Sequence, residues 1–104
     1  MNLFKSQTAQ EITYIRRIFK KLEYFIAIKK IKTQKEAFEF LRECYLEVYY
    51  DTFDSTLDEN IYLNEIFSNS KIESIFNKVD RLSDEERKEF ISSLNRNYYN
   101  SIQP

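Results

Sequence analysis

The chain has 104 residues, of which 42% are hydrophobic, and its 16 Lys or Arg nearly balance its 17 Asp or Glu. It contains no histidine, no glycine and a single cysteine, Cys44. These absences argue against histidine-based catalysis, thiolate zinc clusters, intramolecular disulfides and glycine-rich phosphate loops as they are usually built, so we expect no enzyme, no metal and no cofactor.

Five segments begin with a helix-start signal, in which a Ser or Thr is followed three residues later by an acidic residue. The pairs are Thr8 with Glu11, Thr33 with Glu36, Thr56 with Glu59 or Ser55 with Asp58, Ser70 with Glu73, and Ser83 with Glu86. They predict helices near residues 9–30, 34–52, 57–68, 71–81 and 84–100.

Each predicted helix carries apolar residues at a spacing of 3.6, so each needs neighbours that cover its apolar stripe. The stripes comprise, in chain order, Ile12, Ile15, Ile18, Phe19, Leu22, Phe25 and Ile26; Ala37, Leu41, Cys44, Tyr45 and Val48; Leu57, Ile61 and Ile66; Ile72, Ile75, Phe76 and Val79; and Phe90, Ile91, Leu94, Tyr98 and Ile102. Because the connections are short, we expect an all-α fold, a compact bundle of four to five antiparallel helices, forming one domain over residues 1–104.

The second predicted helix has further apolar residues away from its main stripe, namely Phe38, Phe40, Leu46, Tyr49 and Phe53. This pattern favours a central position in the bundle, and the alternative is a second apolar face for another chain. Ile28 and Ile31 lie off the stripe of the first helix and indicate a bend or a contact there.

Charge is strongly segregated along the chain. Residues 1–35 carry nine Lys or Arg and two Glu, a balance of +7, whereas residues 36–65 carry nine acids and Arg42 alone, a balance of −8. The two charged segments could pair within the fold or in a homodimer, which we favour, or could face an external partner.

Two candidate surfaces follow from this segregation. The acidic candidate combines carboxylates of the second helix with nearby aromatics: Glu36, Glu39, Glu43, Glu47, Tyr50, Asp51, Phe53 and Asp54. The basic candidate lies on the first helix and comprises Arg16, Arg17, Lys20, Lys21 and Tyr24.

The leading functional hypothesis is a non-enzymatic protein-interaction module, such as a small inhibitor, adaptor or immunity-type protein, that binds another protein or itself as a homodimer. The alternative is a nucleic-acid-associated protein that uses the basic candidate surface to contact phosphates. No apolar run is long enough for a membrane span or a signal peptide, so we expect a cytoplasmic protein without membrane contact. The abundance of Ile, Asn and Lys is typical of an AT-rich genome, such as that of a low-GC bacterium, its phage or its plasmid.

Overall fold

The computed structural model describes residues 8–49 and 55–102, except for the side chains of residues 56, 94, 95 and 97–102. Five helices occupy these ranges: α1 (Ala9–Ala27), α2 (Gln34–Tyr49), α3 (Thr56–Ile66), α4 (Asn69–Asp80) and α5 (Asp84–Ile102). No strand occurs within the described ranges, and the predicted all-α fold is confirmed. None of these helices, as far as the described residues go, is long and apolar enough to cross a bilayer.

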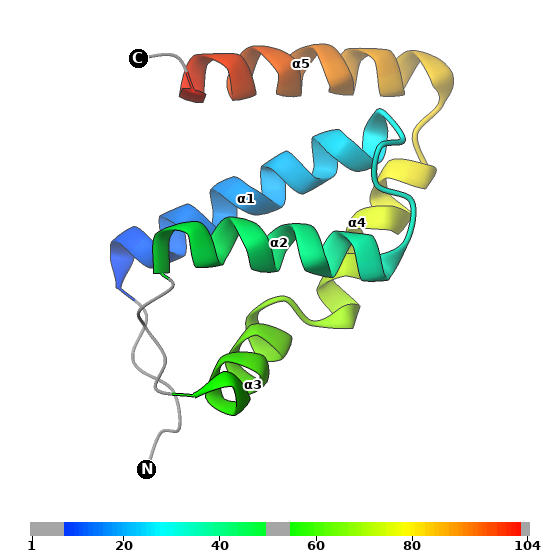
Figure 1. Cartoon of the computed structure of the whole chain (residues 1–104). Coiled ribbons are helices and arrows are strands. Elements are labelled where there is room, and N and C mark those ends of the chain that lie inside the picture. Colours follow the sequence, from blue (N-terminus) through cyan, green and yellow to red (C-terminus); the bar gives the residue numbers. More distant parts are fainter. Residues whose placement is uncertain (1–7, 50–54, 103–104) are drawn as a thin grey trace.

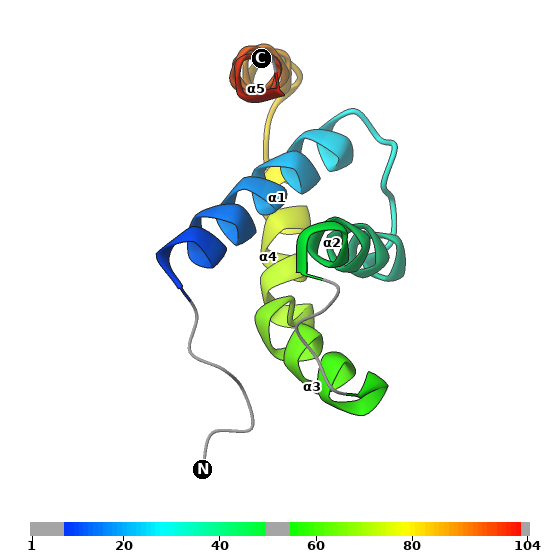
Figure 2. The ribbon, with the colours of Figure 1, turned by 60° about the vertical axis from the view of Figure 1, so that its left-hand side comes forward.

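The helices are arranged around an antiparallel hairpin formed by α1 and α2 (Figure 1). Helix α4 packs against both members of the hairpin and crosses behind them in this view, while α3 links α2 to α4. Helix α5 packs on α1, crosses it obliquely, and stands apart from α2 and α3 in both views (Figure 1 and Figure 2). The hairpin is therefore the element onto which the other helices assemble.

Complete capping boxes start α2 and α5, as the sequence predicts. The Thr33 hydroxyl accepts from the Glu36 N–H at 3.1 Å, and the Glu36 carboxylate accepts from the Thr33 N–H at 3.1 Å. At α5 the Ser83 hydroxyl accepts from the Glu86 N–H at 3.2 Å, and Glu86 accepts from the Ser83 N–H at 3.0 Å. Each box satisfies two backbone groups that would otherwise lack partners at a helix start.

The N-cap residues of α3 and α4 can be compared with the predicted ones. Of the two possible caps for α3, Ser55 is the one used, and its hydroxyl accepts from the Asp58 N–H at 3.1 Å. The prediction that Ser70 caps α4 is wrong, because Ser68 caps it and the helix begins at Asn69. Capping geometry needs only a hydroxyl ahead of the first turn, so two serines two residues apart compete for one role.

Helix α1 ends at Ala27, three residues before the predicted end. Lys29 follows with a positive φ of 63°, and the Lys30 N–H donates back to the Phe25 carbonyl at 2.9 Å. This is a Schellman turn, whose left-handed position is usually glycine; in a chain without glycine a lysine occupies it. The turn also folds Ile31 back against the core, which accounts for its position off the stripe of α1.

The core contains most of the predicted apolar residues of α1, α2 and α4, but α3 presents a different face. Ile66 is buried as predicted, but Leu57 and Ile61 are exposed, and α3 with its C-cap buries Tyr62, Leu63 and Phe67 in their place. Val48 and Ile12 are also exposed, contrary to the prediction. The off-stripe residues Phe38, Phe40, Leu46 and Tyr49 pack against the core, and Phe53 lies outside the described residues. The central helix is nevertheless α1, which packs against α2, α4 and α5, whereas α2 packs mainly on α1 and α4.

Candidate interaction surface on the α1–α2 hairpin

A buried carboxylate lies where α1, α2 and α3 meet. Glu11 is 0% exposed, and its Oε1 atom accepts from the Tyr45 hydroxyl at 2.8 Å and from the Tyr62 hydroxyl at 2.5 Å. Burial, followed by the hydrogen bond with Glu11, raises the pKa of Tyr45 above its ordinary value, so the phenol remains a donor. Because no solvent reaches this carboxylate, its role is to hold three helices in register.

Half-buried aromatic side chains bridge α1 and α2. The Tyr14 hydroxyl donates to the Cys44 carbonyl at 2.6 Å. The Tyr14 and Tyr49 rings meet edge to face with centroids 5.8 Å apart, and Phe25 and Phe40 do so at 5.3 Å. We call these five residues the α1–α2 seam.

The acidic candidate surface is exposed along α2. Glu39, Glu43 and Glu47 are all exposed and form one strip, here called the acidic strip. Glu36 is different, because its carboxylate is engaged by Thr33 and completes the helix cap. The remaining predicted residues, Tyr50, Asp51, Phe53 and Asp54, lie outside the described residues.

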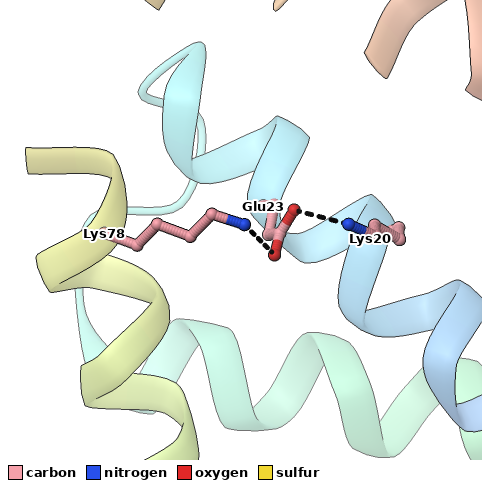
Figure 3. A network of polar contacts seen from close by, with 3 residues as sticks. All are labelled: Lys20, Glu23 and Lys78. Atoms are coloured by element: carbon pink, nitrogen blue, oxygen red, sulfur yellow. Dashed lines mark hydrogen bonds and ion pairs between the residues drawn. The ribbon is translucent and has the colours of Figure 1, made fainter. Parts of the chain in front are cut away.

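The basic candidate surface is divided by the fold. Lys20 lies 3.6 Å from the buried Glu23 carboxylate, which also accepts from Lys78 of α4 at 3.2 Å (Figure 3). Lys20 thus belongs to an ion network that ties α1 to α4. Arg16 and Arg17 are exposed.

The other two predicted basic-surface residues are less exposed than Arg16 and Arg17. Lys21 and Tyr24 are half-buried, and the Tyr24 ring packs edge to face on Phe25 with centroids 5.5 Å apart. Tyr24 therefore extends the aromatic surface at the Phe25 end of the seam.

Charges of both signs lie near the Tyr14 hydroxyl, from Arg17 on α1 and from Glu47 on α2. Burial raises the pKa of the Tyr14 hydroxyl, and the nearby Glu47 carboxylate raises it further. Arg17, one helical turn along α1, acts in the opposite direction. Both charges are therefore close enough to influence one phenol in the seam.

The Cys44 thiol on α2 is also influenced by charges of both signs. Burial raises the pKa of its thiol, Lys21 lowers it, and Glu47 and Glu43 raise it. We therefore name Arg17 and Lys21 the basic strip, since both border the seam from α1.

The raised pKa keeps the Cys44 thiol protonated at neutral pH and unsuited to nucleophilic attack. No group of three or more side chains that could hold a metal gathers within the described ranges.

Arg16 and Arg17 on α1 are exposed, as are Glu39, Glu43 and Glu47 on α2. In the part of the chain that the structure describes, neither Arg16 nor Arg17 forms an ion pair with an acid of α2. The salt bridge that α2 does form joins Arg42 to Glu59 of α3 at 2.7 Å. Aromatic packing and the Tyr14 hydrogen bond hold the hairpin together at this surface, and much of its charge remains outward.

An open depression of about 330 Å³ lies beside the seam, on the N-terminal half of α1. It is lined by Ala9, Gln10, Thr13, Tyr14 and Arg17. Its size and its mixture of polar and aromatic lining suit a single side chain of a bound protein. Sequence reasoning missed Tyr14 and this depression, because a tyrosine at the edge of an apolar stripe carries no signal of a contact 30 residues away.

Comparison with models of known protein families, with curated proteins and with solved structures gives no match in any of the three.

Proposed function

We propose that the protein is a non-enzymatic protein-interaction module of the cytoplasm, an inhibitor, adaptor or immunity-type protein of bacterial, phage or plasmid origin. Its docking surface is the α1–α2 seam with the basic and acidic strips on its two sides. The observation that carries this proposal is that opposite charges border one aromatic seam. An aromatic centre with a polar rim is the usual composition of a protein–protein interface.

The neighbouring strips favour a protein partner over a nucleic acid. A phosphate backbone lying along Arg17 and Lys21 would come alongside Glu43 and Glu47, whose charge repels it. A protein can present both signs in one surface and so complement both strips at once.

One observation favours the nucleic-acid alternative: Arg16 and Arg17 are both exposed. Together with Lys20, Lys21 and Tyr24 they would contact phosphates with little sequence preference, and binding would weaken steeply as salt rises. Lys20 contributes less than its charge suggests, because Glu23 already neutralises part of it.

The test is affinity capture from host lysate with tagged wild-type protein and matched charge-reversal variants. Glu43→Lys with Glu47→Lys reverses the acidic strip, and Glu73→Lys with Glu89→Lys makes the same change at exposed sites on α4 and α5. We expect one protein captured in stoichiometric amount by the wild type and the control pair, and lost with the strip reversal.

The alternative is tested in the same experiment with Arg16→Glu and Arg17→Glu. Recovery of nucleic acid that disappears in this variant and in high salt, without a stoichiometric protein, would contradict the proposed function.

A further inference from the structure

We infer that the α1–α2 seam also binds a second copy of this chain. In the resulting two-fold symmetric dimer, the basic strip of each copy lies on the acidic strip of the other. The inference rests on the proposed function, because it uses the same docking surface and specifies one occupant for it.

The charge pattern distinguishes between the two ways in which the hairpin could face a copy of itself. A two-fold axis perpendicular to the helices would place α1 on α1 and α2 on α2, so like charges would meet. An axis parallel to the helices, running along the seam, places α1 of each copy on α2 of the other. Only this second arrangement brings opposite charges together, and like charges at an interface are strongly disfavoured.

The positions of the strips along the helices fit this arrangement. Two contacts bracket the seam, Tyr14 with Tyr49 at one end and Phe25 with Phe40 at the other. Between these ends lie Arg17 and Lys21 on α1, and Glu43 and Glu47 on α2. A two-fold axis parallel to the helices preserves height along them, so the basic strip of one copy meets the acidic strip of the second at the same level.

The seam supplies apolar surface for the centre of such a dimer. Its members Tyr14, Phe25, Phe40, Cys44 and Tyr49 are half-buried in the single chain, so each retains surface that a second copy would cover. Aromatic residues are enriched in the centres of protein interfaces, and charged residues at their rims. Among the described helices, α4 passes behind the hairpin in the view of Figure 1, and none lies in front of α1 and α2 there.

The experiment is sedimentation equilibrium of the purified full-length chain at several concentrations, in low and in high salt. Two variants reverse one strip each: Glu43→Lys with Glu47→Lys, and Arg17→Glu with Lys21→Glu. We expect wild-type dimers that weaken as salt rises, and a dissociation constant raised at least roughly 100-fold in either reversed variant. An equimolar mixture of the two reversed variants should form a heterodimer, because each now complements the other.

The control is Glu73→Lys with Glu89→Lys, which should dimerise as the wild type does. Circular dichroism checks that each variant keeps its helices; if a reversal unfolds the chain, the neutral pair Glu43→Gln with Glu47→Gln replaces it and should still weaken the dimer. A monomeric wild type, an acidic-strip variant that dimerises like wild type, or a mixture that stays monomeric would overturn the inference. A monomeric wild type whose captured partner is still lost with the strip reversal would leave the proposed function standing.

Discussion

Glu11 has two roles at the residue scale. Its backbone N–H donates to the Thr8 hydroxyl at 3.0 Å, which caps α1, while its side chain turns inward to two tyrosines. The two hydroxyl donors offset part of the cost of burying this carboxyl group, and removing either would leave its oxygen with fewer partners. Glu11 therefore couples the start of α1 to α2 and α3.

Replacing Tyr62 with Phe should cost more stability than replacing Tyr14 with Phe. Tyr62 donates to a buried carboxylate, so its loss should cost about 1.5–3 kcal/mol, whereas Tyr14 donates to a half-buried backbone carbonyl, worth about 0.5–1.5 kcal/mol. Urea unfolding followed by circular dichroism measures both. Equal costs, or a larger cost at Tyr14, would show that Glu11 is not the polar centre of the fold.

Lys29→Gly should stabilise the protein by about 1 kcal/mol. A non-glycine residue with φ of 63° carries a steric cost of roughly 1–2 kcal/mol, and the entropy of the unfolded glycine offsets part of the gain. Thermal unfolding provides the measurement. The control is Lys30→Gly, at the next position of the same turn, which should bring no gain; a destabilised Lys29→Gly variant would argue against the left-handed turn.

At the scale of elements, the five helices were predictable because Ser and Thr hydroxyls signal helix starts locally. The inward face of α3 was not predictable in this way. Leu57 and Ile61 form an apolar pair in the sequence, but Tyr62 and Leu63 are the residues that point inward, and the Tyr62 hydroxyl donates to the buried Glu11 carboxylate. This polar partner is 51 residues away, and periodicity carries no information about such a partner.

The Ser83 cap of α5 should be visible in the titration of Glu86. Hydrogen bonds from the Ser83 backbone and hydroxyl lower the pKa of Glu86 below its ordinary value. Because the folded-state pKa is depressed, this contribution to stability is present above the unfolded-state pKa and is lost as pH falls through the folded-state value. Acidification should therefore weaken the start of α5.

We expect Ser83→Ala to raise the Glu86 pKa toward its ordinary value and to cost about 1 kcal/mol through the lost cap. Carboxyl NMR titration and urea unfolding measure the two effects. Ser92→Ala, an exposed change within α5, should leave the Glu86 titration as it is. A Glu86 pKa at its ordinary value in the wild-type protein would mean that the capping box does not form in solution.

At the scale of the whole molecule, α5 is the least integrated helix. It packs mainly along α1, and no α5 residue whose burial is described is fully buried; Phe90 and Ile91 are only half-buried. Helices with few buried apolar contacts open locally at low cost. Lys78 of α4 adds one contact, since its ammonium group lies 5.6 Å from the centre of the Phe90 ring.

Hydrogen exchange should therefore be faster in α5 than in the hairpin. Helical amides near Phe90 and Ile91 should lose protection well before those of Ile18, Leu22 and Leu41, whose side chains are fully buried. Exchange followed by mass spectrometry or NMR provides the comparison. Equal protection in α5 and the hairpin would mean that the molecule opens as one cooperative unit.

The sequence predicted the charges of the interaction surface but not their arrangement. Segregation between the first and second helices is visible in composition, and the exposure of Arg17, Glu43 and Glu47 follows from the apolar stripes. Their placement on either side of one seam depends on the hydrogen bond from Tyr14 to Cys44, a long-range contact. Local sequence patterns do not predict such a contact between α1 and α2, so they do not predict that the two strips are neighbours.

The central claim is that a partner protein covers the seam and its two strips, and carboxylate footprinting by mass spectrometry tests it most directly. The side chains of Glu39, Glu43 and Glu47 are labelled in the free protein and in the complex with the captured partner or second copy. We predict ready labelling in the free protein and several-fold protection in the complex, with Glu73 and Glu89 unchanged. Equal labelling of the acidic strip in both states, or protection at Glu73 and Glu89 instead, would contradict the account.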